Sequence, residues 1–586
     1  ARLRGAPPWR QAIAICIAAA PRRYRLATGA VLAWLAMAPA VAGPLPAPRP
    51  VLVVTGQPQP GGESLQFRTL AQAVEAAVGL DQPLILLDPG EYQLEGPVTT
   101  ALEIRARTLA EAGPPEPIDW NDCGERSYPL RLEPDVFLGS RDGRPALQVQ
   151  VGPGERVSLS GVALRAPGSV PAAVVAAGEL EVREAQVQGR LIARGEGASL
   201  TLVDVVVAPA PQVDLPPWPG RADDAAGAYG LPIGAGDCEL AAVSVTGGAR
   251  LAGSNLEIHD HTGLGLCVDG GAASLCGGSI HHIWTADGRY GRGAVACGGG
   301  SLILRGVQVH DTGEAGVVVS GRGSRATLAA DTQVLRTGRS AETQIAVGLL
   351  VQNDAAASVE GGVLGSNEGP GLYVSHGAAA TVTGATLSQN AGAGAVVYGA
   401  TASFSRCTIE QTGTDASVGA GCGLYVDHVV FGAATVQVSK CTIADNQLAG
   451  IWVEGDGGSV AVTGTTLANC AVEASRGLHG NGVMARDVCT GLVLTGNQYS
   501  GNQGAQVLLE AANAVLSGST YVSNGVLDFL QQGCTDPCVR PLTEADLAAD
   551  GLSPDTHILG LCPAYDQLTQ STPAFTFRLA EAEVAR

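Results

Sequence analysis

The sequence predicts an all-β protein in which short strands wind into a single-stranded parallel β-helix, and three observations support this. Between about residues 157 and 526, two apolar residues separated by four variable ones recur at a basic step of 22 to 23 residues. Each copy is followed by a glycine and three mostly apolar residues, and asparagine or threonine recurs at one turn position. Recurrence at one short period indicates stacked units that each contact only their neighbours.

The repeated pattern has the character of short strands. It reads LILRGVQV at 302–309, ATVTGATL at 380–387 and VAVTGTTL at 460–467. In the first copy, Leu304 and Val307 can both face inward, and Gly306 is suited to the bend that shifts the phase between them. Strands this short cannot form amphipathic helices and suit alternation with a period of two. Stacked coils can bury these apolar edges, because equivalent strands pair in parallel about 4.8 Å apart.

A turn position three residues after the second apolar residue supports the register of the coils. This position holds Asn367, Asn390, Asn446, Asn502 and Asn524, then Thr312, Thr337 and Thr412, and Cys470 in one coil. Asparagine amides at equivalent positions can bond from coil to coil, as amide ladders do in cross-β assemblies. Asparagine also tolerates the left-handed backbone that such a turn requires.

The segment before the repeats predicts a cap for the exposed parallel edge. Residues 67–79 read as a helix, and residues 83–94 read as strand, turn and strand. The apolar face of the helix comprises Leu70, Ala73, Val74, Ala77 and Val78. The helix, the following LDPGEY (87–92) and the apolar–glycine coils resemble the right-handed parallel β-helix proteins of the pectate-lyase-like superfamily. The resemblance covers most of residues 51–530.

That resemblance implies right-handed coils with an N-terminal capping helix, and it implies no single activity. The superfamily holds lyases, hydrolases, epimerases, adhesins and proteins without known activity. The sequence also lacks the Arg-x-Pro-x-x-Arg pattern of the pectate lyases and the Asp-Pro-His-Asp pattern of the alginate epimerases. Function must therefore be argued from individual residues.

The chain divides into five predicted segments. They are a leader (1–42), a linker with the first strand (43–66), the N-terminal cap with the first coils (67–150), the β-helix repeats (151–530) and a C-terminal cap or tail (531–586). A projecting insertion (208–236) interrupts the repeats. The leader reads as an export signal, with Arg22 and Arg23 before the apolar run 26–37 and the small residues 40–42. We expect a secreted, periplasmic or cell-surface protein, attached to a membrane only if the leader stays uncleaved.

The charge and the cysteine content of the chain indicate which kinds of partner and which compartment to expect. The net charge of −20 argues against nucleic acid, because neutralising phosphates requires clustered basic residues. The 14 cysteines fit an oxidising compartment. Cys407 and Cys441 share an inward position, and Cys534 and Cys538 could close a small loop. No Cys-x-x-Cys pair exists, so no structural zinc site is expected, and no metal is expected. No cofactor is expected either, and calcium stays open without any motif for it.

The densest polar column follows the second apolar position in three successive coils. These coils read His259-Asp260, His281-His282 and His310-Asp311, so the three leading histidines should stack on one face. A long inserted loop follows directly after the second of these pairs. Loops inserted at the same turn of successive coils project from one edge of a solenoid. The predicted ligand-binding residues are His259, Asp260, His281, His282, Trp284, Asp287, Arg289, Tyr290, Arg292, His310 and Asp311.

These residue types suit a carbohydrate ligand. Tryptophan and tyrosine can stack on sugar rings, and arginine can bind a uronate carboxylate through two hydrogen bonds. His281, Tyr290 and Arg289 are the catalytic candidates, because histidine or tyrosine could move a proton. The alternative is a solvated turn face whose His–Asp pairs bond only locally. Tyr373, Tyr425 and Trp452 also share one offset and would form a line for a glycan if they faced outward, with core packing as the alternative.

The predicted function is therefore binding, with a polysaccharide or cell-envelope glycan as the favoured ligand, or a structural role at the cell envelope, in both cases without catalysis. The alternative function is that of a polysaccharide lyase, epimerase or hydrolase acting on a uronate-containing glycan. Turnover of such polymers would favour the enzyme, whereas the absence of any glycan ligand would favour the structural role.

Overall fold

A computed structural model provides the coordinates. It describes residues 50–55, 65–110, 134–140, 144–167, 170–209, 237–285, 290–329, 331–415, 421–429, 431–472, 480–522, 528–532, 540, 542–550, 552 and 557–561. The predicted leader, most of the insertion 208–236 and most of the tail 531–586 lie outside these residues. None of the helices in the described part of the chain is long and apolar enough to cross a membrane.

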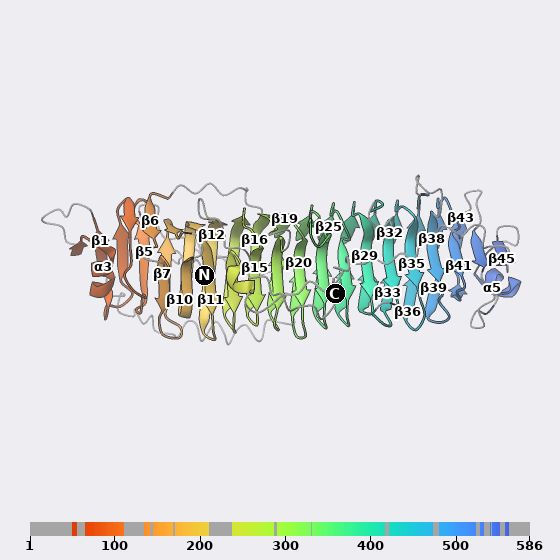
Figure 1. Ribbon diagram of the computed structural model, residues 1–586, viewed down its shortest axis with the longest axis horizontal. Helices are drawn as coiled ribbons and strands as arrows, with labels where there is room; N and C mark the ends of the chain where they lie inside the picture. The colour runs from red at the N-terminus through yellow and green to blue at the C-terminus, as the bar shows by residue number, and fades with distance from the viewer. Residues whose placement is uncertain are drawn as a thin grey trace, which may run out of the picture. The chain divides into compact units, whose positions relative to one another are not determined.

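The strands stack in parallel along a solenoid, in the order of the chain (Figure 1). One coil consists of β20 (Ala315–Ser320), β21 (Arg325–Leu328) and β22 (Gln333–Leu335). These strands pair in parallel with β23, β24 and β25 of the next coil. In these coils β20 and β23 belong to sheet B, and the other strands belong to sheet A. The predicted all-β parallel β-helix is confirmed.

Sheet B follows the glycine-led segments. Its strands are β7 (Leu147–Gln150), β10 (Pro171–Gln188), β11 (Arg190–Arg194), β13 (Val243–Thr246), β15 (Leu264–Asp269), β17 (Arg292–Cys297), β20, β23 (Val347–Gln352), β26 (Leu372–Ser375), β29 (Gly392–Tyr398), β32 (Gly421–Asp427), β35 (Ala449–Glu454), β38 (Asn481–Arg486), β41 (Val507–Glu510), β44 (Phe529–Gln532) and β45 (His557–Leu561).

Sheet A contains two columns of strands, one for each half of the repeated pattern. The first column is β1 (Val51–Val54), β2 (Leu65–Phe67), β3 (Leu84–Leu87), β5 (Leu102–Ala106), β8 (Arg156–Ser160), β12 (Ala198–Ala208), β14 (Arg250–His259), β16 (Ala272–Ile283), β18 (Ser301–Arg305), β21, β24 (Ala356–Glu360), β27 (Ala379–Thr383), β30 (Thr401–Ser405), β33 (Thr435–Ser439), β36 (Ser459–Thr463), β39 (Leu492–Thr495) and β42 (Val515–Ser517).

The second column of sheet A carries the candidate site at its C-terminal ends. It consists of β4 (Gly90–Tyr92), β6 (Val136–Gly139), β9 (Val162–Arg165), β19 (Gln308–Thr312), β22, β25 (Val363–Gly365), β28 (Thr386–Ser388), β31 (Thr408–Glu410), β34 (Thr442–Ala444), β37 (Thr466–Ala468), β40 (Gln498–Ser500) and β43 (Thr520–Val522). The long strands β10, β12, β14 and β16 run through both columns.

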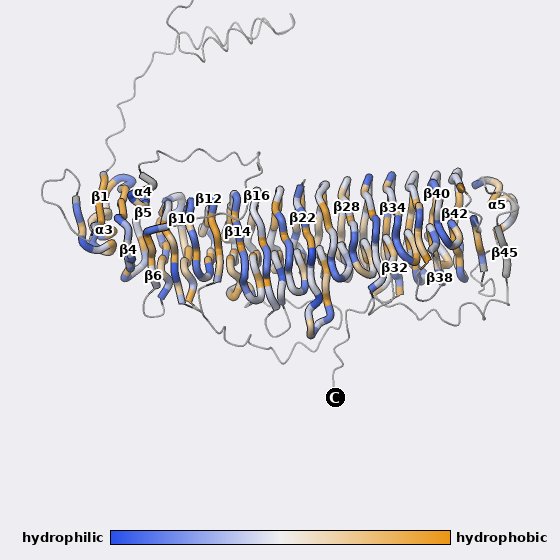
Figure 2. The backbone as a smooth tube through the Cα atoms, turned by 90° about the horizontal axis from the view of Figure 1, so that it is seen from above, coloured by the Kyte–Doolittle hydropathy of each residue, from blue (hydrophilic) through white to orange (hydrophobic). Residues whose placement is uncertain are grey.

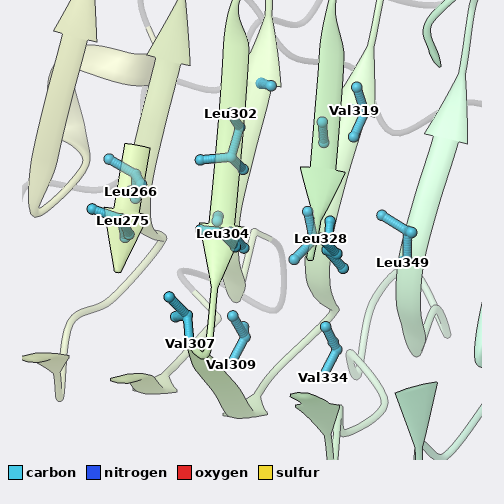
Figure 3. Packing of buried hydrophobic residues seen from close by; sticks show 14 of the residues in the cluster. Leu266, Leu275, Leu302, Leu304, Val307, Val309, Val319, Leu328, Val334 and Leu349 are labelled. Carbon is cyan, nitrogen blue, oxygen red and sulfur yellow. The ribbon is translucent and has the colours of Figure 1, made fainter. Parts of the chain in front are cut away.

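Apolar side chains from successive coils stack in the interior of the solenoid. Val382 pairs with Phe404, which pairs with Val438, so residues 22 and 34 positions apart are direct neighbours. All three are at most 1 % exposed. Figure 3 shows Leu304 and Val309 packed among their equivalents from neighbouring coils. Hydrophobic segments recur at equivalent places along the stack (Figure 2), as expected where one side of each strand faces the core.

The predicted asparagine ladder is present inside the turn. Asn390 Oδ1 accepts hydrogen bonds from the main-chain nitrogen of Asn367 (3.3 Å) and from its Nδ2 (2.8 Å). The main-chain nitrogen of Thr337 donates to Asn367 Oδ1, and that of Cys470 donates to Asn502 Oδ1. The residue before each ladder position has a left-handed backbone, as in Gln389 with φ 57°. The ladder residue expected at 524 lies outside the described residues.

Helix α3 (Leu70–Ala77) lies where the sequence predicts a helix. Thr69 caps it by accepting a hydrogen bond from the main-chain nitrogen of Gln72 (3.2 Å). Leu70, Ala73 and Ala77 are buried, and the helix packs against β1 and β2. Val78, expected on the same face, is the C-cap residue and is 62 % exposed. The capping role of α3 stays a prediction. The other helices are short: α4 (Arg107–Ala110), α5 (Glu544–Ala549) and the 3₁₀ turn η2 (Asp237–Leu240).

Cysteines occupy both the core and sheet B. Cys407 and Cys441 are buried in the interior, as expected from their inward position. Cys238 and Cys267 form a disulfide, and the thiol sulfur of Cys297 lies 3.7 Å from that of Cys238. The proposed loop of Cys534 and Cys538 lies outside the described residues.

Candidate binding face

The three histidines predicted to stack do so. His259 pairs with His281, and His281 pairs with His310, at the ends of β14, β16 and β19. The ring centroids are 5.4 Å and 4.9 Å apart, and the ring planes are tilted by 10° and 2°. These separations follow from the strand spacing of about 4.8 Å. The predicted column is therefore a geometric consequence of parallel pairing in register.

The residue after each of these histidines lies at the left-handed corner of the turn. Asp260, His282 and Asp311 have φ values of 59°, 51° and 53°. Aspartate adopts this conformation more readily than most residues, because its short side chain bonds to nearby groups. The stacked histidines, the residues that follow them and their neighbours together form a surface that we name the histidine face. It consists of Glu257, His259, Asp260, His281, His282, Trp284, His310, Asp311 and Arg336.

The outer coils of the face hold histidine–aspartate pairs. His259 Nδ1 is 2.8 Å from Asp260 Oδ2, and His310 Nδ1 is 2.6 Å from Asp311 Oδ2. Arg336 binds Asp311 through two hydrogen bonds of 2.8 Å. These bonds hold the pKa of the Asp311 carboxyl well below its usual range. Burial lowers the pKa of His310, although its hydrogen bond to Asp311 opposes this. Local bonding at these coils matches the alternative of a solvated turn.

The central coil is different, because its two histidines bond to each other. His281 Nε2 is 3.2 Å from Oε1 of Glu257, whose side chain is only 4 % exposed. His281 Nδ1 is 2.9 Å from His282 Nδ1. If His281 donates to Glu257 in its neutral form, its Nδ1 accepts from His282, and His282 Nε2 is left as an acceptor. The side chain of His282 is 43 % exposed, so this acceptor can meet a ligand.

Trp284 adds an exposed ring to the central coil. It is 51 % exposed, which is unusual for so large an apolar side chain. Its ring lies over that of His282, with the centroids 5.6 Å apart and the planes tilted by 24°. Its main chain is fixed by a hydrogen bond of its nitrogen to the carbonyl of His261 (2.8 Å). The ring is therefore held beside the polar column rather than carried on a free loop.

Two of the other predicted site residues are placed elsewhere, which corrects the expected face. Arg292 is 2 % exposed, and its Nε donates to Glu314, which is fully buried, over 2.7 Å. It is part of an internal ion pair and cannot meet a ligand at the surface. Tyr290 is partly buried. It packs against a cluster of apolar side chains on the outer side of sheet B, which we name the outer apolar cluster. Asp287 and Arg289 lie outside the described residues.

The aromatic line on sheet B is also buried. Tyr373, Tyr425 and Trp452 are at most 2 % exposed. The rings of Tyr425 and Trp452 meet edge to face, 5.8 Å apart, within the same outer cluster. These residues therefore fit core packing, which was the alternative to a line of exposed rings.

Two residues of the face were missed by the sequence reasoning. Glu257 stands two positions before His259, so strand alternation places both on the same side, and this signal was available. Arg336 follows the position equivalent to His310 by one residue, since His310 pairs with Leu335. Within the part of the chain that the structure describes, the histidines do not bring three ligand atoms to one point. The sulfurs of Cys238, Cys267 and Cys297 do lie within 4.8 Å of one another, but the first two are joined in the disulfide.

A match to a family model supports the fold. Residues 347–527 match the family model described as right handed beta helix region. No curated protein matches the chain. Two solved structures that are similar to this chain are the A-modules of the mannuronan C-5 epimerases AlgE6 and AlgE4 of Azotobacter vinelandii, both 14 % identical to it in sequence. The overlaps cover 77 % of this chain and 93 % and 95 % of those chains, with TM-scores of 0.26 and 0.28.

A third overlap is with the catalytic unit of an alpha-1,3-glucanase from Streptomyces thermodiastaticus. It is 15 % identical and covers 84 % of this chain and 66 % of that chain, with a TM-score of 0.28. Overlaps at these identities and TM-scores carry no argument about activity.

Proposed function

We propose that this right-handed parallel β-helix protein binds an extended glycan through its histidine face. The observation that carries the proposal is the exposed ring of Trp284, which is stacked beside a row of hydrogen-bonding side chains that crosses three coils. An apolar ring with polar groups around it is the usual composition of a sugar-binding surface. A row that repeats at each coil suits a ligand that also repeats, lying along the solenoid.

The charges of the face favour sugar units that are rich in hydroxyl groups. Asp260, Asp311 and Glu257 supply carboxylates, and Arg336 is already bound to Asp311. A second carboxylate brought by a ligand would meet a surplus of negative charge there. Hydroxyl groups can instead donate to the carboxylates of Asp260 and Asp311, whose side chains are accessible, and to His282 Nε2.

The test is a glycan array followed by titration of the best ligand. Replacing Trp284 by alanine should weaken binding about tenfold, because aromatic stacking is worth about 0.5–1.5 kcal/mol beyond area burial. The same change at Val515, a 62 % exposed valine in β42, serves as the control. An array without any ligand, or a Trp284→Ala variant that binds like the wild type, would refute the proposal.

A second candidate is catalysis on a uronate-containing glycan, favoured by the chain of contacts Glu257–His281–His282. A buried carboxylate that orients one histidine and, through it, a second one is an arrangement suited to accepting a proton. Both nitrogens of His281 are engaged in this chain, so His282 takes the role first assigned to His281. In a lyase or an epimerase, His282 Nε2 would take the proton from the carbon beside the uronate carboxylate.

Catalysis has its own test. The purified protein is incubated with uronate polymers, and new unsaturated chain ends or altered sugar stereochemistry are measured. We expect His282→Ala and Glu257→Gln to lose turnover while the folded protein keeps its circular dichroism spectrum. If the wild type leaves every polymer unchanged, the binding function stands alone.

A further inference from the structure

A pocket lies on the same edge of the solenoid as the histidine face, in the first coils. Its volume is about 450 Å³, within the range of small-molecule sites. It is lined by Glu91, Tyr92, Gln93, Phe137 and Arg165, among others. These residues lie in or directly after β4, β6 and β9, which belong to the second column of sheet A. The pocket is therefore built from the same structural positions as the histidines.

The strand register links the two places directly. Arg165 pairs with Gln188, and Gln188 pairs with Ala208. In the next coil, Val207 pairs with Ile258, the residue before His259. Arg165 and His259 therefore occupy equivalent positions, three strand spacings or about 14 Å apart. His310 is two spacings further on.

Arg165 is held in place but is not saturated with partners. The central carbon of its guanidinium lies 3.6 Å from the ring centre of Phe137, so the cation stacks on the ring. Among the described residues, no group accepts a hydrogen bond from its buried Nε. Its Nη1 lies 3.9 Å from an oxygen of Glu91, whose side chain is 81 % exposed. A long contact to so exposed a carboxylate is weak and readily replaced.

We propose that this pocket is a second subsite, which binds a carboxylate-bearing sugar unit of the same glycan; this inference rests on the proposed function. The planar guanidinium of Arg165 suits a carboxylate through two parallel hydrogen bonds. Stacking on Phe137 fixes the plane in advance, which lowers the entropy lost on binding. The incoming carboxylate takes the place of Glu91, which turns into solvent.

The two subsites differ in charge, and this difference orders the ligand. The histidine face carries surplus carboxylates and favours neutral units, whereas Arg165 favours an acidic one. The distance from Arg165 to His310 is five strand spacings, or about 24 Å. The ligand is thus a mixed polymer with acidic and neutral sugars, long enough to span several coils.

The experiment measures the affinity of three probes by calorimetry. They are a hyaluronan oligosaccharide, in which glucuronate alternates with a neutral sugar, a fully acidic oligogalacturonate and a neutral cello-oligosaccharide. The wild type should bind hyaluronan most tightly. Arg165→Lys keeps the charge and the stacking but loses the planar fork, and it should weaken hyaluronan binding about tenfold. The same variant should leave cello-oligosaccharide binding unchanged.

Two further variants keep the outcomes separate. Glu91→Gln removes the competing carboxylate and should tighten hyaluronan binding, while Arg325→Lys, which changes an exposed arginine of β21, should change nothing. If Trp284→Ala weakens binding but Arg165→Lys does not weaken it and Glu91→Gln does not tighten it, the second subsite is refuted and the binding function survives. If none of the probes binds the wild type, the glycan function itself fails for these sugars. Free glucuronate that still shifts the Arg165 Nε–H resonance would then support the pocket alone.

Discussion

Replacing Asn390 by alanine should open the solenoid locally, because this residue stands in the middle of the ladder. It is 1 % exposed. Its Oδ1 accepts two hydrogen bonds from Asn367, and its Nδ2 donates to the carbonyl of Leu364 over 2.9 Å. The alanine variant leaves three buried polar groups without these partners. At about 1–1.5 kcal/mol for each group, we expect a loss of about 3–4.5 kcal/mol.

The assay must be local, because the coils of a solenoid interact mainly with their neighbours and need not unfold together. Hydrogen exchange followed by mass spectrometry reports the opening free energy of each segment. Peptides that cover 363–367 and 386–391 should exchange about a hundredfold to a few thousandfold faster in the variant. Peptides from β12, many coils away, should keep the wild-type rate.

The matched control is Gln389→Ala, at the exposed neighbouring position of the same turn. Its side chain bonds to two other outward residues, Ser366 and Gln411. Surface changes of this kind usually alter stability by less than about 0.5 kcal/mol. If Asn390→Ala exchanges no faster than Gln389→Ala, the ladder does not hold the coils together and the reasoning is wrong.

Three further predictions concern buried groups. Burial holds the pKa of His261 at about 3, so only the unfolded chain gains a proton as the pH falls from about 6.5 towards 3. Stability should drop over this window by up to about 1.4 kcal/mol per pH unit, and urea unfolding of His261→Asn should show a flatter dependence. Cys267→Ser should let Cys238 pair with Cys297, because the two sulfurs are 3.7 Å apart; a peptide map with both thiols free would contradict this. Glu314→Gln leaves a buried guanidinium without its charged partner and should cost about 3–5 kcal/mol, and a melting curve like that of the wild type would contradict this.

The fold could be predicted because the spacing of the apolar residues and the ladder positions determine which residues pair between neighbouring coils. Val382, Phe404 and Val438 occupy one position of the pattern, and they stack as expected. The histidine column followed from the same count, since His259, His281 and His310 keep a fixed offset from the apolar residues. Where the offset is fixed, position in the sequence gives position in space.

The sequence could not give the whole site, because an inserted loop changes the number of residues in a coil and the fixed offset from the apolar residues is lost there. Arg292 looked like part of an exposed loop, yet it opens β17 and pairs with Ala315, which brings it beside Glu314. Nothing in the linear order shows that an acidic residue one coil away will bury the guanidinium. Tyr425 and Trp452 likewise alternate outward in their strands, and only the structure shows that this outer side of sheet B is buried too.

The equivalence of Arg165 and His259 makes the distance between the two subsites a matter of whole coils. Because Gln188 pairs with Ala208, deleting residues 189–208 removes one coil and shortens the distance between the two subsites by about 4.8 Å. Inserting a copy of the same stretch lengthens it by the same step, and neither change touches a contact residue of the histidine face. The distance between the two subsites can therefore be changed only in steps of one coil, and the length of the glycan that binds best should change in the same steps.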